Sequence, residues 1–369
     1  MKLIRRIFKW TGIAILVAVL AGGLYLFVAY WRSSSDCDRD TAAPANPMKA
    51  IRKCEYGSVT LRDVEKPVPT DNQILVRVRS ASLNAADGHL LRGSFLMRPF
   101  SGMRKPQDSR FGIDCAGTVE AVGKNITKFK AGDEVFGVAN GSIAEYAISS
   151  ERSLVTKPEN ITFEEAGSVG VAGLTALQGL RDQGNIQPGQ KVLVNGASGG
   201  VGTFAVQIAK AFGAEVTAVC STRNIEQARA IGADHVIDYT KEDFTKGDQR
   251  YDMIFDNVGN HTIAERRRVL TPNGICVLAG MGSAGKHEGQ WSRLTGNLKA
   301  FVVSPFIPQK FKFYIAKTLS ADLAVLRDLM QEGKVKPAID RKYPMYKTAE
   351  ALSYLEEGHA RGKVVIAIE

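Results

Sequence analysis

The sequence predicts an α/β protein of two domains that follow an apolar N-terminal helix. Three observations lead to this prediction. The chain has 369 residues, more than one typical hydrophobic core contains. Residues 48–165 form short apolar runs separated by glycine turns, whereas strand-like and helix-like segments alternate over residues 166–310. The first 32 residues contain an uncharged stretch long enough to span a bilayer.

The composition is that of an ordinary globular protein, with 44% hydrophobic and 23% charged residues. The net charge of +10 is spread along the chain without a run of five or more like charges. Such a balance can favour anionic ligands or an anionic membrane surface, but it lacks the basic stripe of a nucleic-acid-binding protein. We therefore expect no nucleic-acid partner.

Five cysteines occur without a C-x-x-C spacing. Four of them sit in or beside apolar stretches, where cysteine behaves as a small buried hydrophobe; these are Cys54, Cys115, Cys220 and Cys276. We expect neither a disulfide framework nor a structural zinc lobe.

The segment Thr11–Trp31 has 21 residues and no charge. As a helix it would measure roughly 30 Å, the thickness of the hydrocarbon layer. Trp10, Tyr30 and Trp31 at its ends resemble an interfacial aromatic belt. A cleaved signal peptide is the alternative, but the run is longer than a signal core and no small-x-small cleavage site follows it. We favour a retained single-span anchor.

The polar, proline-bearing stretch 33–47 is typical of a tether. In the region after it, apolar residues alternate at Ile74, Val76 and Val78, which predicts half-buried strands of an antiparallel, barrel-like domain. The strand–helix alternation that follows predicts right-handed crossovers and a parallel sheet covered on both faces. Residues 311–369 contain two amphipathic helices and a last strand, so the parallel domain sits between two parts of the first domain.

A glycine turn, "KVLVNGASGGVG", has an apolar strand before it and a predicted helix from Thr203 to Phe212 after it. Its Ala-x-Gly-x-x-Gly spacing is the dinucleotide fingerprint with alanine in the first place. Glycine lets the backbone approach a pyrophosphate, and the helix N-terminus offers it free N–H groups. The predicted contacts are Ala197, Ser198, Gly199, Gly200, Val201 and Gly202.

The next strand ends in "CSTRN", without the carboxylate that an NAD site uses for the ribose 2′-hydroxyl. Hydroxyl groups and a guanidinium suit a 2′-phosphate instead. We therefore predict NADPH as cofactor, held in part by Ser221, Arg223 and Asn224. Arg223 as a solvated loop charge is the alternative.

Four basic residues precede the apolar span, against Arg32 and Arg39 soon after it. This imbalance predicts a cytoplasmic N-terminus. The catalytic body would then lie away from the cytosolic pool of reduced cofactor. The side of the membrane on which the body lies stays open.

Several motifs, in order, resemble the medium-chain dehydrogenases/reductases, in particular their zinc-independent, zeta-crystallin-like quinone oxidoreductase branch. They include "SLNAADGHLLRG", "FGIDCAGTVEAVG", "QPGQKVLVNGASGGVG" and "GKVVIAI", and the resemblance covers about residues 48–369. It implies a GroES-like domain built from both ends of the chain around a Rossmann domain, and often a homodimer. The boundaries we predict are an anchor over 1–32, a linker over 33–47, a GroES-like domain over 48–165, a Rossmann domain over 166–310 and the return over 311–369.

The resemblance also indicates what replaces zinc. Zinc alcohol dehydrogenases of the superfamily have a ligand cysteine where this chain has Asn84, and a Gly-His-Glu motif where it has Gly112-Ile113-Asp114. An amide and an aliphatic side chain cannot act as thiolate and imidazole ligands. We therefore expect no metal.

Without a Lewis acid, alcohol oxidation lacks the means to stabilise an alkoxide. Hydride transfer to an electron-poor acceptor, a quinone or the β-carbon of an α,β-unsaturated carbonyl (an enone or enal), requires less of the protein. One alternative is an NADP-dependent alcohol or aldehyde oxidoreductase that works without zinc. Another is a membrane-tethered nucleotide-binding scaffold with little turnover.

By resemblance, Asn84 and Asp87 line the nicotinamide side of the cleft. His89 and Phe95 stand where the family often has tyrosines, and His89 either supplies a hydrogen bond or proton or is merely structural. The stretch "FLMRPFSGMRKPQDSR" is either a lid over a lipophilic substrate or an ordinary loop. Further cofactor contacts implied by the resemblance are Thr175, Tyr239, Asn257, Gly280 and Lys363.

Overall fold

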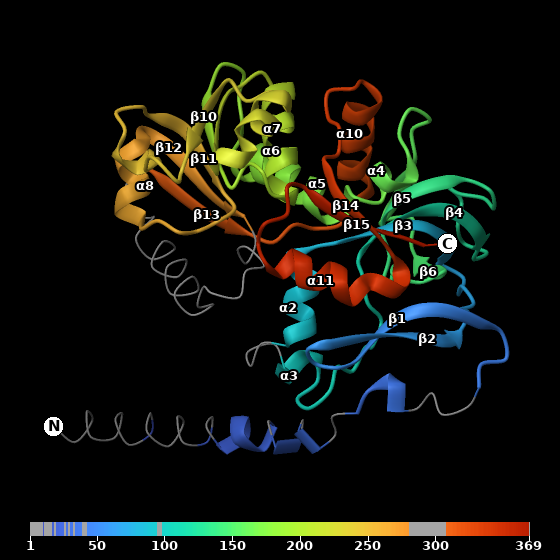
Figure 1. Ribbon diagram of the computed structural model, residues 1–369. Helices are drawn as coiled ribbons and strands as arrows, with labels where there is room; N and C mark the ends of the chain where they lie inside the picture. The colour runs from blue at the N-terminus through green and yellow to red at the C-terminus, as the bar shows by residue number, and fades with distance from the viewer. Residues whose placement is uncertain are drawn as a thin grey trace.

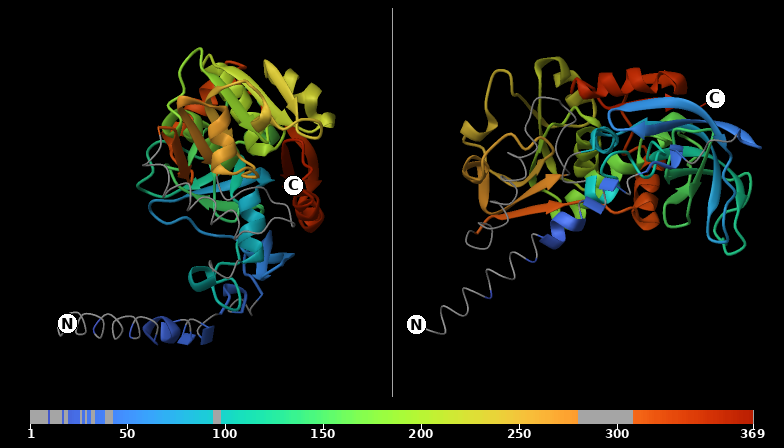
Figure 2. Two further views of the ribbon diagram at one scale, coloured as in Figure 1. Left: turned by 90° about the vertical axis from the view of Figure 1, so that its left-hand side faces the viewer. Right: turned by 90° about the horizontal axis from the view of Figure 1, so that it is seen from below.

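The computed structural model describes residues 10, 17, 20–25, 27–28, 30–31, 34–38, 43–93, 98–279 and 308–368. Two large sheets and one small hairpin make up its strands. Figures 1 and 2 show the two large sheets at opposite ends of the molecule, with helix α5 (Gly170–Gln178) between them. The predicted division into a β-rich and a parallel domain is confirmed.

The parallel domain contains a six-stranded sheet of order β10-β9-β8-β11-β12-β13, in which every pair is parallel. This is the doubly wound Rossmann order, and it reverses between β8 and β11. The sheet continues to Tyr314, because β13 pairs with β12. Its strands are β8 (Lys191–Asn195), β9 (Glu215–Cys220), β10 (His235–Asp238), β11 (Tyr251–Asp256), β12 (Leu270–Ala279) and β13 (Lys310–Tyr314).

Apolar residues that alternate along these strands explain why both faces are covered. Val192 and Val194 point into the core shared with α5 and α6, whereas Leu193 belongs to the core that Val269 of α8 helps to close. Side chains on opposite faces of a strand therefore each find a helix layer. The helices of this part are α6 (Gly200–Ala211), α7 (Ile225–Ala230), α8 (Ile263–Val269) and α10 (Ser320–Gln331).

The β-rich domain contains a seven-stranded sheet completed by the end of the chain. Strand β15 (Lys363–Ala367) pairs antiparallel with β3 (Ile74–Leu83), and Val364 lies opposite Leu83. The predicted alternation is present, but Ile74, Val76 and Val78 are fully buried. The other strands are β4 (Asp114–Val122), β5 (Glu134–Val138), β6 (Tyr146–Ser149), β7 (Leu154–Thr156) and β14 (Ile339–Pro344).

A separate hairpin and several short helices complete this domain. The hairpin of β1 (Pro47–Glu55) and β2 (Ser58–Glu65) contacts the segment just before β6 through a bridge between Ala50 and Ala144. Figure 1 shows it on the same side of the sheet as the first short helices. The helices are α2 (Ala85–Arg92), α3 (Arg98–Ser101), α4 (Phe163–Ala166) and α11 (Thr348–Glu356).

The expected membrane anchor, Thr11–Trp31, falls largely outside the described residues. The described residues 20–25 are helical, and the Leu20 and Leu24 side chains are exposed. Among the residues that the structure describes, none belongs to a helix that is both long and apolar enough to cross a membrane.

One disulfide joins Cys37 and Cys54, a bond that the sequence analysis, which expected no disulfide framework, did not predict. The tether is not extended here, because its Asp36 carboxylate accepts the Ser109 N–H at 3.0 Å and Asp38 pairs with Lys105 at 2.9 Å. These contacts bring Cys37 to strand β1. The sequence hides the pairing because it depends on a fold of the linker that composition does not encode. Cys115, Cys220 and Cys276 are buried and free, as expected.

We expect the variant C37S/C54S to unfold with a free energy lower by about 3 kcal/mol, the chain-entropy value for a loop of this length. The bond joins cysteines 17 positions apart. Without it, the unfolded chain has more conformational freedom in this segment, so unfolding becomes more favourable. Urea denaturation of both proteins without reductant measures the difference. Equal midpoints and slopes would contradict the pairing.

Candidate active site

The glycine turn has the strand–turn–helix geometry that the sequence predicts. Strand β8 ends at Asn195, Gly196 turns with a φ of +84°, and α6 begins at Gly200. A Cβ on Gly202 would lie 2.1 Å from the carbonyl oxygen of Gly196. Only glycine therefore allows the helix to start so close to the strand. The helix begins before the predicted Thr203 because the glycines adopt its first turn.

This turn is suited to a dinucleotide pyrophosphate. Gly199 is the N-cap residue of α6 and gives no side-chain cap to the helix. The first N–H groups of a helix have no intrahelical partner, and together with the helix dipole they attract an anion. The sheet order reverses beside this point, which is where doubly wound folds bind dinucleotides. The geometry fits the predicted cofactor.

Three residues predicted for the adenosine end lie after β9 and β10, next to Ser198 of the glycine turn. The Asn224 amide donates to the hydroxyl oxygens of Ser198 at 3.0 Å and Ser221 at 3.1 Å. The exposed Tyr239 follows β10, and its N–H donates to the carbonyl of Cys220, the last residue of β9. The structure thus brings Ser198, Ser221 and Asn224 together, with Tyr239 beside them.

Arg223 bridges the two domains. Its Nη2 donates to the carbonyl of His359 at 2.8 Å, and Gln227 donates to the carbonyl of Arg361 at 2.7 Å. Both acceptors lie in the loop before β15. Arg223 is therefore not a purely solvated charge.

Asp238, which the sequence analysis missed, places a carboxylate near this corner. The Thr222 hydroxyl donates to it at 2.5 Å, and the Thr240 hydroxyl donates to its other oxygen at 2.7 Å. These hydrogen bonds, led by that of Thr222, hold its pKa below the ordinary value. The predicted absence of acid at the end of β9 holds, but the neighbouring strand supplies an acid whose oxygens are occupied.

A buried carboxylate, Asp114 at the start of β4, connects the two domains. Its Oδ2 accepts from the hydroxyl of Ser82 at 2.8 Å and from the Asn84 amide at 2.9 Å. The Lys363 ammonium lies 3.1 Å from the same oxygen. Its Oδ1 accepts the Val171 N–H at 2.7 Å, in the first turn of α5. The predicted residues Asn84 and Lys363 therefore meet at Asp114. The sequence analysis had considered Asp114 only as part of Gly112-Ile113-Asp114, which stands where zinc alcohol dehydrogenases have their Gly-His-Glu motif.

Lys363 links this cluster to the glycine turn. Its side chain is 2% exposed, and its Nζ donates to the Asn84 Oδ1 at 2.5 Å. A Cβ on Gly200 would meet the Lys363 Cδ at 3.0 Å. The lysine stem thus packs against the cofactor turn while its charge lies at Asn84 and Asp114.

Asp87 is buried one turn into α2, and its Oδ2 accepts the Asn84 N–H at 2.8 Å. Burial raises the pKa of this carboxyl to about 7, and the negative charge of Asp114 acts in the same direction. The Asn84 N–H and the charges of Lys363 and Lys53 oppose the rise. Asp87 can therefore carry a proton close to neutral pH.

The residues at this position do not fit zinc. Both polar atoms of the Asn84 amide are used, by Lys363 and by Asp114, and an ammonium already lies where a divalent cation would need its ligands. Within the described ranges, no three His, Cys, Asp or Glu side chains cluster in a way that could hold a metal ion.

The other predicted site residues are dispersed. Thr175 lies on α5, where its hydroxyl donates to the carbonyl of Val171 at 2.7 Å. Val171 is one helical turn before Thr175, and its N–H is the group that donates to Asp114. His89 Nδ1 lies 3.3 Å from a guanidinium nitrogen of Arg92. Residues two apart on a helix lie roughly 200° apart around its axis, so His89 and Asp87 point to different sides of α2. The role of His89 stays a prediction, whereas Phe95 and Gly280 lie outside the described residues.

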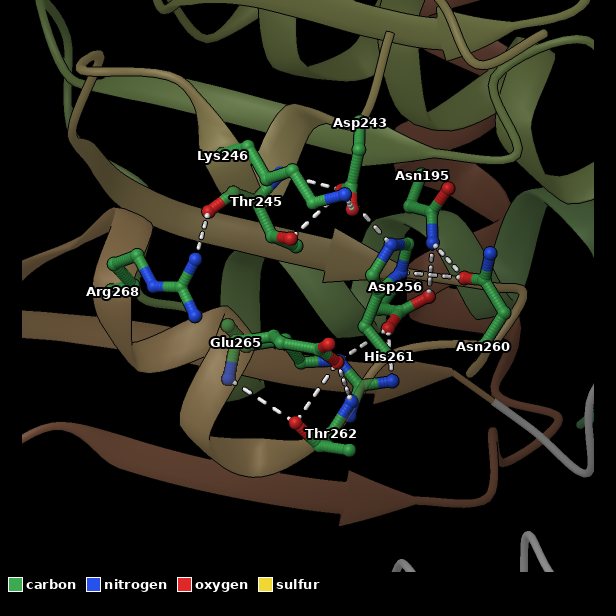
Figure 3. Close-up of polar contacts among 11 residues, drawn as sticks. Asn195, Asp243, Thr245, Lys246, Asp256, Asn260, His261, Thr262, Glu265 and Arg268 are labelled. Atoms are coloured by element: carbon green, nitrogen blue, oxygen red, sulfur yellow. Dashed lines mark hydrogen bonds and ion pairs between the residues drawn. The ribbon is translucent and has the colours of Figure 1, made fainter.

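The turn after β11 contains Asn257 and is held by a buried ion pair (Figure 3). Asp256 accepts the N–H groups of Val258 and Gly259 at 3.1 and 2.9 Å. Its other oxygen lies 2.6 Å from Nη2 of the buried Arg266. Asn195, at the end of β8, also donates to Asp256 at 2.9 Å. This cluster fixes the two strand ends between which the sheet order reverses.

Two protein families match the chain. "Alcohol dehydrogenase GroES-like domain" matches residues 70–159, and "Zinc-binding dehydrogenase" matches residues 231–366. One of these families is named for zinc, but this chain has Asn84 and Ile113 where zinc alcohol dehydrogenases have a cysteine and a histidine ligand.

Several named relatives match most of the chain. A chloroplast envelope quinone oxidoreductase homolog of Arabidopsis thaliana is 33% identical over 86% of this chain and 98% of its own length. The NADPH-dependent alkenal/one oxidoreductase of the same plant is 33% identical over 86% of this chain and 79% of its own. The solved quinone oxidoreductase of Coxiella burnetii superposes with a TM-score of 0.76 at 28% identity, over 88% of this chain and all of that one.

These matches define the class. The chain belongs to the medium-chain dehydrogenase/reductase superfamily, in its quinone oxidoreductase-like branch, and it is an oxidoreductase.

Proposed function

We propose that this oxidoreductase uses NADPH to reduce a quinone or an α,β-unsaturated carbonyl, without a metal. NADPH, when bound, supplies a hydride to the acceptor. The observation that carries the proposal is the buried Lys363–Asp114–Asn84 cluster at the position of the superfamily's zinc. An acceptor that is already electron-poor does not need a Lewis acid.

The chain's own residues divide the work. The glycine turn and the N-terminus of α6 hold the pyrophosphate, while Ser221, Arg223 and Asn224 hold the 2′-phosphate. By resemblance to the family, Asn84 and Asp87 line the nicotinamide side of the cleft, and the carboxyl of Asp87 holds a proton near neutral pH. The names of two relatives, a quinone oxidoreductase homolog and an NADPH-dependent alkenal/one oxidoreductase, support the same interpretation.

An acceptor panel tests the proposal. The full-length protein should consume NADPH, followed by its absorbance, with 1,4-quinones and with medium-chain enals or enones. It should not reduce NADP with simple alcohols. Alcohol oxidation with NADP would support the zinc-free alcohol oxidoreductase instead. Tight NADPH binding without turnover on any acceptor would support a scaffold, and either result contradicts the proposal.

We expect Arg223→Ala to weaken NADPH binding about tenfold while changing NADH binding by less than about twofold, because only NADPH presents a 2′-phosphate to the guanidinium. Fluorescence titration with each cofactor measures both changes. Gln227→Ala is the matched control, since it loses the other hydrogen bond to the loop before β15. Equal losses for the two cofactors in R223A would mean that Arg223 only joins the domains.

We further propose that the uncharged segment Thr11–Trp31 holds the enzyme at a membrane, where a lipophilic quinone or enal would be available. The support is its length in sequence and the aromatic residues at its ends. Carbonate extraction of membranes from the native host tests it, because an anchored protein stays in the pellet. The possible homodimer stays a prediction, which sedimentation of the purified protein would test.

A further inference from the structure

Three charged groups from different elements influence the carboxyl of Asp87. Asp114 belongs to β4, Lys363 to β15 and Lys53 to β1, and each acts on Asp87 through its charge. Helix α11, which also packs on α2, presents Glu356, and this side chain is ion-paired with Arg92. The charges that act on Asp87 are thus one anion and two cations, of which Asp114 and Lys363 are held by hydrogen bonds to each other.

The ion pair between Lys363 and Asp114 is part of a hydrogen-bonded ring. Lys363 donates to Asn84 and Asp114, and Asn84 donates in turn to Asp114, so the three side chains close a ring. This ring determines which end of the Asn84 amide faces which partner. The N–H of the same asparagine donates to Asp87. Asn84 therefore connects the Lys363–Asp114 pair to Asp87 by hydrogen bonds.

We propose that the Lys363–Asp114 pair is a positioning device that fixes the Asn84 amide and lets the Asp87 carboxyl keep a proton for the reduced acceptor. This inference rests on the proposed function for the fate of the proton. Lys363 is then a positioning residue rather than only a cofactor contact.

The proton balance is simple. A hydride adds to the β-carbon of an unsaturated carbonyl, and the electron pair of the double bond moves to give an enolate. One proton then completes the saturated product, or the hydroquinone if the acceptor is a quinone. The carboxyl of Asp87 gives up that proton, becomes a carboxylate and regains a proton from water.

The pH dependence of stability tests the electrostatic part without any substrate or cofactor. The carboxyl has an ordinary pKa of 3.8 and a folded value of about 7. The folded state therefore binds more protons between these values, so the stability contributed by Asp87 is fully present below pH 3.8 and is lost as pH rises to about 7. The free energy of unfolding of the wild type minus that of Asp87→Asn, measured by urea denaturation, should fall over this range and then level off.

Charge variants should move the pH at which this difference levels off, in opposite directions. Lys363→Met is introduced into both the wild type and the Asp87→Asn protein. The pH at which their difference in unfolding free energy levels off should then rise by about one unit or more, and with Asp114→Asn in both proteins it should fall. Lys53→Met should give a smaller upward shift than K363M. The neutral double variant K363M/D114N removes both charges of the pair and guards against misfolding of either single variant; its levelling point should lie between those of the two singles.

The second readout is turnover. The alkaline limb of the rate–pH profile, where Asp87 loses the proton that it donates, should follow the same shifts, and Lys363→Arg should reverse most of the K363M shift. Levelling points that do not move in K363M and D114N would overturn the proposal, as would shifts in the same direction. If stability shifts as expected and no acceptor is reduced, the proposed function fails while the electrostatic arrangement stands.

Discussion

Replacing Gly202 by alanine is expected to weaken NADPH binding by about 100-fold or more, equivalent to at least 2.7 kcal/mol. The new Cβ would lie 2.1 Å from the carbonyl oxygen of Gly196 and 2.8 Å from two backbone atoms of Ala197. Backbone atoms cannot rotate away as a flexible side chain can, so the turn must open and the N-terminus of α6 must withdraw from the pyrophosphate. Fluorescence titration with NADPH measures the loss.

Gly247→Ala is the matched control. Gly247 has an ordinary negative φ, and its nearest neighbour to a new Cβ is the Phe244 carbonyl at 3.8 Å. This variant should bind NADPH as the wild type does. Unchanged binding in G202A with an intact circular dichroism spectrum would mean that the cofactor does not use this turn.

Replacing Arg266 by methionine is expected to lower the free energy of unfolding by about 3–5 kcal/mol, because it leaves the buried charge of Asp256 without its partner. Arg266 and Asp256 are 5% and 2% exposed, and the Arg266 Nε donates to Asp256 at 2.7 Å. The same change should loosen the turn that contains Asn257. Urea denaturation at pH 7 gives the loss of stability.

Arg268→Met is the control from the same helix. In Figure 3 its guanidinium points to the carbonyl of Thr245, at 3.4 Å, rather than to a buried carboxylate. We expect this variant to lose less than about 1 kcal/mol. Equal losses for the two variants would contradict a special role for the Asp256–Arg266 pair.

The features that sequence predicts well are those encoded locally. The glycine turn can be recognised from sequence, because an apolar strand, one alanine and two glycines at fixed spacing and a helix lie within about twenty residues. The alternation of strands and helices likewise indicated the parallel sheet. For the same reason the sequence predicts the serine and arginine after β9 as cofactor contacts, and their role stays a prediction.

The features that sequence could not provide depend on distant contacts. Lys363 meets Asn84 across 279 positions of the chain, and nothing in "GKVV" or "LNAAD" states that they touch. The resemblance to the family placed both residues in the cleft but gave no reason for the lysine. Cys37 and Cys54 are closer in sequence, but their pairing depends on the docking of Asp36 against Ser109.

Transfer of deuterium tests the central claim most directly. The full-length enzyme is given an α,β-unsaturated aldehyde with NADPH deuterated at C4 of the nicotinamide, and the product is analysed by NMR and mass spectrometry. The account predicts a saturated aldehyde with deuterium at the β-carbon, a proton from water at the α-carbon and no stoichiometric zinc in the enzyme used. An allylic alcohol with deuterium at the carbon that was the aldehyde carbonyl would contradict it.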